Sequence, residues 1–257
     1  MSAQSPQPAK PVTACLVIIG NEILSGRTQD ANLAYMAKKL NTVGVQLREA
    51  RVIPDVVATI VATVNEVRTA FDYVFTTGGI GPTHDDITSA CIAQAFGVKL
   101  VRHPDAQRIL EDYYKPADRT PARMKMADVP EGATLVQNPV SRAPGFRIAN
   151  VFVFAGVPRI MQAMLDNVAP TLKGGLPVIS RAIASQVREG ALAAGLEAIQ
   201  NEFPDVDIGS YPSFEAGSYG TSIVLRATAK PRLDAATEKV IALKRGLGGL
   251  PVEQPVV

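Results

Sequence analysis

Two kinds of hydrophobic pattern alternate through the first two thirds of the chain: short continuous apolar runs, and longer stretches with an apolar residue at every third or fourth position. The short runs are typical of strands buried on both faces of a parallel sheet, and the longer periodicity is typical of amphipathic helices. Strands are predicted at residues 13–19, 45–53 and 72–77, each followed by a helix. Three successive strand–helix units predict a doubly wound α/β sheet with right-handed crossovers.

The pattern changes after residues 173–177, whose sequence Lys-Gly-Gly-Leu-Pro is typical of a linker. Beyond it, strands are predicted at 178–187, 206–211 and 222–229, and helices at 190–203 and 233–247. This order predicts a small antiparallel α+β layer domain with its helices on one face. We therefore expect a larger domain at residues 12–172, a smaller one at 178–247, and an unstructured tail over 248–257.

The most informative loop follows the third strand, where residues 78–88 read Gly-Gly-Ile-Gly-Pro-Thr-His-Asp-Asp-Ile-Thr. Apolar residues from Ile87 onward have helical spacing, so a helix is predicted to begin near Asp85 or Asp86, capped by one of them or by Thr83. Amides at a helix start, beside glycines that allow close approach, favour phosphate binding. The loop has no Walker-type lysine, so two carboxylates beside a phosphate imply a divalent cation. A tight turn with a helix cap is the structural alternative.

Carboxylates also follow the first two predicted strands. Glu22 lies in the loop after residues 13–19, and Asp55 follows residues 45–53. Ligands of doubly wound sheets bind beyond the carboxyl ends of the strands, so we expect Glu22, Asp55 and the Asp85–Asp86 pair to share one rim. Arg123 and Lys125, on a later predicted helix, could reach a phosphate there, but an exposed helix face is the commoner explanation for such residues.

Composition narrows the classes of function. The 26 Lys and Arg residues exceed the 24 Asp and Glu residues by only two, which argues against a nucleic-acid surface driven by bulk charge. Cys15, in a predicted strand, and Cys91, on a predicted helix face, have no metal-ligand spacing and are expected to be small core residues. No apolar run reaches membrane-spanning length, so we expect no membrane partner and a cytoplasmic location.

Residues 78–88, with residues 19–24 (Ile-Gly-Asn-Glu-Ile-Leu) and 28–32 (Thr-Gln-Asp-Ala-Asn), resemble the molybdopterin-binding-like domain of the competence/damage-inducible CinA family. The chain is still more similar to the N-terminal domain of eukaryotic-type FAD synthases, over residues 52–55 and 93–97 and over 209–212 in the second predicted domain. The resemblance implies a three-layer α/β domain of molybdopterin-binding type with a mostly parallel sheet, followed by a small KH-like α+β domain. It also implies that the chain forms a homo-oligomer.

The resemblance implies one of two activities. CinA-type and FAD-synthase-type domains are metal-dependent pyrophosphatases that act on ADP-ribose or FAD, whereas the Mog and MoaB relatives bind molybdopterin and promote its adenylylation or metal insertion. The doubled acid at Asp85–Asp86 favours the hydrolase branch, because the Mog-like pattern usually has a single acid there. Ser141 and Arg142 stand where the family usually has Gly-Thr, a departure at the substrate end of the pocket.

The leading hypothesis is cleavage of a dinucleotide diphosphate, of FAD or ADP-ribose type, to AMP and a second phosphorylated product. Asp85 and Asp86 would hold the divalent cation (Mg²⁺, Mn²⁺ or Co²⁺, with K⁺ as an additional ion), and Glu22 or Asp55 would orient water or complete the metal shell. The alternative is a molybdopterin-binding protein without hydrolase activity. The remaining expected roles are phosphate binding by Gly78, Gly79, Gly81 and Thr83, nucleotide binding or helix capping by Asn32, and either a base or an exposed loop residue at His84.

Overall fold

The computed structural model describes residues 11–215 and 218–255 and divides the chain into two compact units, Met1–Leu176 and Pro177–Val257. The division falls at the end of the predicted linker. Each unit has its own hydrophobic core. Within the described ranges, no helix combines the length and apolar character needed to cross a membrane.

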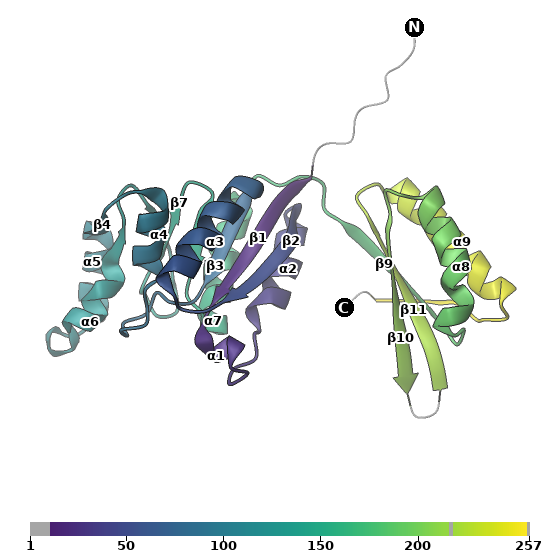
Figure 1. Ribbon diagram of the computed structural model, residues 1–257, viewed down its shortest axis with the longest axis horizontal. Helices are drawn as coiled ribbons and strands as arrows, with labels where there is room; N and C mark the ends of the chain where they lie inside the picture. Colours follow the sequence, from purple (N-terminus) through teal and green to yellow (C-terminus); the bar gives the residue numbers. More distant parts are fainter. Residues whose placement is uncertain (1–10, 216–217, 256–257) are drawn as a thin grey trace, which may run out of the picture. The chain divides into compact units, whose positions relative to one another are not determined.

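Unit 1 contains a six-stranded sheet in which four neighbouring strands pair in parallel and the last two pairings are antiparallel (Figure 1). The predicted α/β fold with a mostly parallel sheet is confirmed. All residues of β1 from Ala14 to Ile19 are buried, because helices cover both faces of this strand. In order across the sheet, the strands are β2 (Val45–Ile53), β1 (Val12–Ile19), β3 (Tyr73–Thr77), β8 (Val151–Phe154), β7 (Gly145–Ile148) and β6 (Thr134–Val136).

Helices cover the two faces of this sheet, which makes three layers (Figure 1). Leu16 packs with side chains of α2 and α7 on one face, and its neighbour Val17 packs with side chains of α3 and α4 on the other. Cys15 and Cys91 are free, buried thiols in the core on the α3–α4 side, so the expectation that they are core residues is confirmed. The helices of these layers, with two short ones at their ends, are α1 (Asn21–Leu24), α2 (Asn32–Thr42), α3 (Val57–Ala70), α4 (Thr88–Phe96), α7 (Pro158–Val168) and η3 (Ala169–Thr171).

Short elements fill the chain between α4 and β6. Prolines occupy early positions in three of their helices, where the missing backbone N–H costs no hydrogen bond. Ala106, Leu110 and Ala127 form a small separate core under them. These elements are β4 (Leu100–Arg102), α5 (Pro104–Tyr113), η1 (Pro116–Asp118), α6 (Pro121–Met124), η2 (Lys125–Ala127) and β5 (Asp128–Pro130), with β4 and β5 paired antiparallel.

Unit 2 is a four-stranded antiparallel sheet with two helices on one face, as the second hydrophobic pattern predicts (Figure 1). Ile223 and Leu225 of the central strand pack against Leu192, Leu233 and Val240 of the helices. In order across the sheet the strands are β10 (Asp207–Glu215), β11 (Ser218–Ala227), β9 (Ile179–Ser185) and β12 (Val252–Gln254), and the helices are α8 (Glu189–Glu202) and α9 (Lys230–Gly246).

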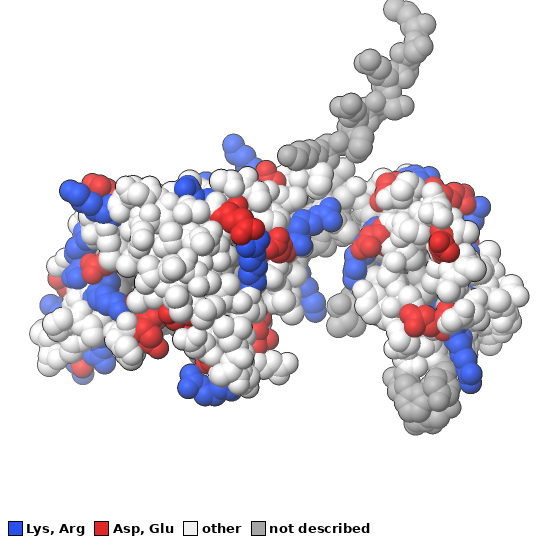
Figure 2. Space-filling model, viewed as in Figure 1, with Lys and Arg blue, Asp and Glu red and all other residues white. Residues whose placement is uncertain are grey.

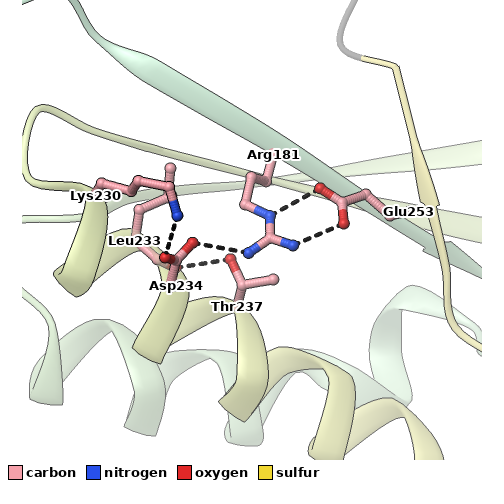
Figure 3. A network of polar contacts seen from close by, with 6 residues as sticks. All are labelled: Arg181, Lys230, Leu233, Asp234, Thr237 and Glu253. Atoms are coloured by element: carbon pink, nitrogen blue, oxygen red, sulfur yellow. Dashed lines mark hydrogen bonds and ion pairs between the residues drawn. The ribbon is translucent and has the colours of Figure 1, made fainter.

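The prediction of an unstructured tail over 248–257 is wrong for β12, which pairs with β9 at one edge of the sheet. Figure 3 shows the contacts that hold this strand: Arg181 of β9 makes two hydrogen bonds to the Glu253 carboxylate, at 2.8 and 2.7 Å, and one to Asp234 of α9 at 2.9 Å. Arg181 therefore joins the last strand to both the sheet and a helix. Pairing with a partner distant in sequence gives this short polar segment its strand conformation.

Charged side chains of both signs are interspersed over the face of the molecule drawn in Figure 2. Blue and red side chains often adjoin, consistent with the twelve ion pairs found among the described residues. The expectation that no nucleic acid binds stays a prediction.

Candidate functional site at the carboxyl edge of the parallel strands

The glycine loop, defined as residues 78–87 between β3 and α4, lies directly on the ends of neighbouring strands. The Gly78 N–H donates to the Phe154 carbonyl at the end of β8, at 3.1 Å. Gly78 has a φ of 101°, and a Cβ atom there would lie 2.1 Å from the Ile19 carbonyl oxygen at the end of β1. Only glycine fits this position, because both the backbone conformation and the close approach exclude a side chain. The ends of β1, β3 and β8 therefore meet at the glycine loop.

The start of α4 differs from the prediction. The helix begins at Thr88 rather than near Asp85 or Asp86, and no side chain caps its first residues. Thr88 instead ties the helix to the glycines, since its N–H donates to the Gly79 carbonyl at 2.9 Å and its hydroxyl donates to the Gly78 carbonyl at 3.0 Å. The two carboxylates consequently lie in the loop and not on the helix.

Asp86 closes a turn with Thr83. Its Oδ2 atom accepts hydrogen bonds from the Thr83 N–H, at 2.8 Å, and from the Thr83 hydroxyl, at 2.5 Å. A local bond of this kind competes with helix formation, which explains why α4 begins later than its apolar periodicity suggests. The Asp86 carboxylate also packs on Gly81, where an added Cβ would lie 2.7 Å from Oδ2. Gly81, Thr83 and Asp86 thus form one compact turn.

Asp85 is exposed beside the same turn and stays ionised at neutral pH. The Thr83 side chain and the backbone N–H of Asp85 lower the pKa of this carboxyl group, and the charges of His84 and Lys125 lower it further. The single hydroxyl proton of Thr83 can serve only one carboxylate at a time, and its 2.5 Å contact is with Asp86. Neither Asp85 nor Asp86 forms an ion pair among the described residues.

Three consecutive amides of the glycine loop have no acceptor. Among the described residues, the N–H groups of Gly79, Ile80 and Gly81 donate no hydrogen bond, and all three residues are partly exposed. Backbone N–H groups without protein partners need water or a ligand acceptor. Adjacent amides in a turn with glycines present a concave, positively polarised surface to an anion.

The other two predicted acids lie together at the ends of β1 and β2. The Gly20 N–H donates to the Ile53 carbonyl at 3.1 Å, and Asp55 accepts the Asn21 N–H at 2.9 Å. The Glu22 carboxylate folds back on Gly20, where an added Cβ would lie 2.6 Å from its oxygens. The structure thus places Glu22 in the short helix α1 rather than in a loop, next to the segment that carries Asp55. Asp85 and Asp86 lie in another loop at the same edge, and among the described residues no hydrogen bond or ion pair joins the two pairs of acids.

Asn32, the first residue of α2, links this edge to the loop after β8. Its Nδ2 donates to the Gly156 carbonyl at 2.8 Å, which also fixes the orientation of the amide because only nitrogen can donate. A Cβ at Gly156 would lie 3.2 Å from Gly78. The Oδ1 atom of Asn32 is buried and has no hydrogen-bond donor. Asn32 does not cap α2; the Asp30 carboxylate instead accepts the Leu33 N–H at 2.8 Å.

Lys125 is the functional candidate that the sequence pattern undervalued. Its Nζ atom donates to the Thr83 carbonyl at 2.5 Å, across 42 positions of the chain. Arg123, by contrast, is bound within its own segment, by an ion pair with Asp118 at 3.0 Å and by contact with the Tyr114 ring. The placement of Lys125 depends on how residues 100–130 fold, so spacing along the sequence could not reveal it.

The donor set fits a metal ion shared with a ligand rather than one held by protein alone. Among the described residues, no three His, Cys, Asp or Glu side chains gather in a metal-binding group. Mg²⁺ is commonly bound by one or two carboxylates together with substrate phosphates. Asp85 and Asp86, next to the unpaired amides of the glycine loop, match that pattern, and the metal itself stays a prediction.

A cavity of about 430 Å³ lies away from this edge, and none of the predicted site residues lines it. It opens beside the edge strand β6, over Phe152 and the last turn of α7. Its rim of Gln137, Arg147 and Asn167 is exposed, and no unpaired buried polar atom lies in it. The chemistry expected from the sequence therefore belongs to the glycine loop and its neighbours.

Two known protein families match successive parts of this chain. Residues 15–174 match the family described as "Probable molybdopterin binding domain". The chain belongs to this family. Residues 177–246 match a second family, described as "FAD synthase, middle domain". The first match covers most of unit 1, and the second covers most of unit 2.

Individual relatives agree with this assignment. A protein of Archaeoglobus fulgidus is 36% identical over 197 residues, which cover 77% of this chain and 84% of the archaeal protein. A CinA-like protein of Desulfosudis oleivorans is 39% identical over 170 residues, 62% of this chain but only 41% of that protein. The solved structure of CinA, a protein of unknown function from Thermoplasma acidophilum, superimposes with a TM-score of 0.59 at 34% identity, covering 62% of this chain and 96% of that one.

Proposed function

We propose that the protein hydrolyses a dinucleotide diphosphate, of FAD or ADP-ribose type, to AMP and a second phosphorylated product in the presence of a divalent cation. The observation that supports this most is the run of unpaired amides at Gly79, Ile80 and Gly81 beside the Asp85–Asp86 pair. Amides alone would suit any anion. Amides together with two carboxylates suit an anion that arrives with a metal ion.

Each residue has a role in this proposal. The amides of Gly79 and Gly81 bind phosphate oxygens and stabilise the negative charge that grows in the transition state. The Thr83 hydroxyl can join them only by turning away from Asp86, because its one proton is donated there. Gly78 provides the close backbone approach that places the loop. Asp85 and Asp86 hold the cation, which supplies charge neutralisation at the phosphoryl oxygens when it is bound. Thr83 sets the geometry of Asp86 through its N–H and its hydroxyl.

Glu22 and Asp55 lie at the ends of β1 and β2, and a water molecule at this edge needs an acceptor to orient it. Asp55 has one oxygen, Oδ2, engaged with the Asn21 N–H, so its second oxygen is available. Glu22 makes no ion pair among the described residues and is only partly exposed. We assign water orientation to one of these two carboxylates, and separate Glu22→Gln and Asp55→Asn variants distinguish them.

The substrate class is supported by both units. Unit 2 matches the middle domain of FAD synthase, and the relatives include CinA-like proteins. Asn32, at the same edge, has an unpaired Oδ1 atom, which can only accept a hydrogen bond. Such an acceptor fits a hydroxyl or amino group of a nucleotide and not a phosphate oxygen. Oδ1 is buried in this conformation, so a nucleotide can reach it only if neighbouring residues move.

The test is to incubate the full-length protein with FAD or ADP-ribose and Mg²⁺, Mn²⁺ or Co²⁺, and to measure AMP by chromatography. We expect AMP release that requires the metal and falls at least about 100-fold in Asp85→Ala and Asp86→Ala, the scale expected when transition-state charge stabilisation is removed. Asp112→Ala, an exposed acid on α5, is the matched control. Absence of metal-dependent AMP release from the unmodified protein contradicts the proposal.

A second function is favoured by the family match over residues 15–174, which describes a molybdopterin binding domain. In that case the same loop binds the phosphate of a pterin without catalysing hydrolysis. This alternative predicts saturable pterin binding, weakened by Gly81→Val, together with no AMP release from FAD or ADP-ribose. A fluorescence titration with the pterin, run beside the hydrolysis assay on the same preparation, distinguishes the two functions.

A further inference from the structure

The glycine loop contains two acids and no basic residue apart from His84, yet one positive charge reaches it from elsewhere. Lys125 donates from Nζ to the Thr83 carbonyl at 2.5 Å. Thr83 is the residue whose N–H and hydroxyl bind Asp86, so the ammonium group lies at the turn that carries both carboxylates.

The backbone that carries Lys125 is held firmly by its own segment. Thr120 accepts the Arg123 N–H at 3.3 Å and so caps α6. The Arg123 guanidinium pairs with Asp118 and lies over the Tyr114 ring. Ala127, two residues after Lys125, is fully buried. The base of the Lys125 side chain is therefore fixed, and the residue is partly exposed, which allows the ammonium group to turn toward a ligand.

Two arginines of this segment make their contacts within it. The Nε and Nη2 atoms of the Arg119 guanidinium donate to the carbonyls of Tyr114 and Glu111, at 3.1 and 2.6 Å, and Arg123 donates to the Asp118 carbonyl at 2.9 Å. These contacts brace the connection between α5 and α6. Lys125 is different because its contact leaves the segment and ends at the glycine loop.

We propose that Lys125 is a phosphate-binding residue of the carboxyl-edge site. The proposal rests on the proposed function for its substrate, a nucleotide diphosphate. An ammonium group has three donors, and the Thr83 carbonyl takes one of them, which leaves two for phosphate oxygens. Asp85 and Asp86 bring two negative charges to the loop, and Lys125 offsets one of them. The repulsion between the loop and a diphosphate is therefore smaller, even without the contribution of a metal ion. Residues 100–130 thus supply the lysine that the loop itself lacks.

A purely structural role for Lys125 makes different predictions. If the residue only braced Thr83, its loss would loosen the turn but would not depend on the charge of the ligand, and a bound phosphate would not shield its amine. A charge-assisted hydrogen bond to phosphate is worth about 1.5–3 kcal/mol, which corresponds to roughly 10-fold to 100-fold in affinity. An arginine at position 125 would retain the positive charge and part of this affinity, whereas a glutamine would retain neither.

The first experiment titrates inorganic pyrophosphate with Mg²⁺ into full-length protein by isothermal calorimetry. We expect Lys125→Gln to weaken binding at least about 10-fold and Lys125→Arg to recover part of the loss. Lys115→Gln, an exposed lysine of the same segment, should bind like the unmodified protein. Thermal unfolding of each variant checks that the fold is intact. Unchanged pyrophosphate binding in a folded Lys125→Gln protein overturns the proposal.

The second experiment needs no variant, so it decides the matter even if Lys125→Gln does not fold. The unmodified protein is acetylated in limiting reagent with and without pyrophosphate and Mg²⁺, and acetylation of Lys125 and Lys115 is measured by mass spectrometry. We expect pyrophosphate to slow acetylation at Lys125 by several-fold and to leave Lys115 unchanged. Equal acetylation of Lys125 under both conditions contradicts a phosphate contact, as does failure of the unmodified protein to bind pyrophosphate.

The two proposals can fail separately. If FAD and ADP-ribose are not hydrolysed but pyrophosphate still binds and protects Lys125, the proposed reaction is wrong and the phosphate site at Lys125 stands. If AMP release depends on Asp85 and Asp86 but Lys125→Gln leaves both KM and kcat unchanged, the reaction stands and the role of Lys125 is wrong. A rise in KM with little change in kcat supports binding of phosphate in the ground state as well as the transition state.

Discussion

At the scale of single residues, Gly78 and Gly26 show how differently two left-handed glycines can constrain a loop. Their φ angles are 101° and 72°. A Cβ at Gly78 would lie 2.1 Å from the Ile19 carbonyl oxygen, whereas nothing lies within 4 Å of one at Gly26. A side chain would therefore strain the backbone at both positions, but it would overlap a neighbouring atom only at Gly78.

We predict that Gly26→Ala lowers the free energy of unfolding by about 1 kcal/mol, the usual cost of a left-handed alanine. Gly78→Ala should cost about 3 kcal/mol or more, because β1 or the glycine loop must also move. Urea unfolding of the two variants, followed by circular dichroism, measures the difference. Equal costs would show that the ends of β1 and β3 are not in the close contact described.

The two thiols provide a second test at this scale. Burial raises the pKa of Cys15 to about 11 and also raises the pKa of Cys91. The thiolate is the reactive form, and neither side chain reaches solvent. We predict that neither thiol of the folded protein reacts with a thiol reagent at pH 8 over minutes, and that both thiols react in guanidinium chloride. Rapid reaction of one thiol in the folded state would contradict the burial of its strand or helix.

Sequence alone was informative where a residue's partners are its neighbours in the chain. The glycines, Thr83 and the two acids of the glycine loop form one continuous motif, so their proximity follows from the sequence. Lys125 and Asn32 act on partners 42 and 124 positions away, at Thr83 and Gly156. Those contacts depend on how whole elements pack, which no local pattern encodes.

At the scale of elements, α4 shows the limit of periodicity. Its apolar spacing predicted most of the buried face, since Cys91 and Ala95 lie in the core and Ile87 packs against it, but Ala90, at the same spacing, is exposed. Its first residue was predicted two or three positions too early, because Asp86 bonds back to Thr83 instead of capping the helix. Side-chain to backbone bonds of this kind compete with helix initiation, and they are also what leaves the acids in the loop.

The edge strand β12 was missed for a related reason. Its three residues are exposed and polar or isolated apolar, so nothing in the sequence marks a strand. The strand exists because Glu253 meets Arg181 and the backbone pairs with β9. Elements of the parallel sheet were predicted well because their apolar runs are long, whereas this element depends on backbone pairing and an ion pair with residues about 70 positions away.

We predict that Glu253→Gln lowers the midpoint of thermal unfolding of unit 2 at neutral pH, by at most about 4 °C for so exposed a pair. Arg181 lowers the pKa of Glu253, so the pair stabilises the fold above the ordinary glutamate pKa. That contribution is lost as the pH falls through the lowered value. The midpoints of the variant and the unmodified protein should therefore converge in acid.

The exposed Glu238 on α9 gives the matched control, and Glu238→Gln should leave the midpoint unchanged at every pH. Scanning calorimetry at neutral and acidic pH makes the comparison. A difference between Glu253→Gln and the unmodified protein that persists below the pKa of both states would mean that Glu253 acts through something other than its charge.

At the scale of the whole molecule, the residues proposed for function all belong to unit 1, while unit 2 has a separate core of its own. Leu16 is buried in the core of unit 1, and Leu225 is buried in the core of unit 2. A ligand that binds one folded unit raises the unfolding temperature of that unit alone, provided the two unfold independently. The change in unfolding temperature that a ligand causes can therefore show which unit binds it, without the two units being produced separately.

We predict that Leu16→Ala and Leu225→Ala each destabilise one calorimetric transition, by about 2–5 kcal/mol, as expected for a large cavity in a packed core. Pyrophosphate with Mg²⁺ should raise the transition that Leu16→Ala lowers and leave the one that Leu225→Ala lowers in place. The two variants control for each other, because each marks its own unit. A ligand-induced rise in the transition marked by Leu225→Ala would place the anion site in unit 2, and the glycine loop would then lose its proposed role.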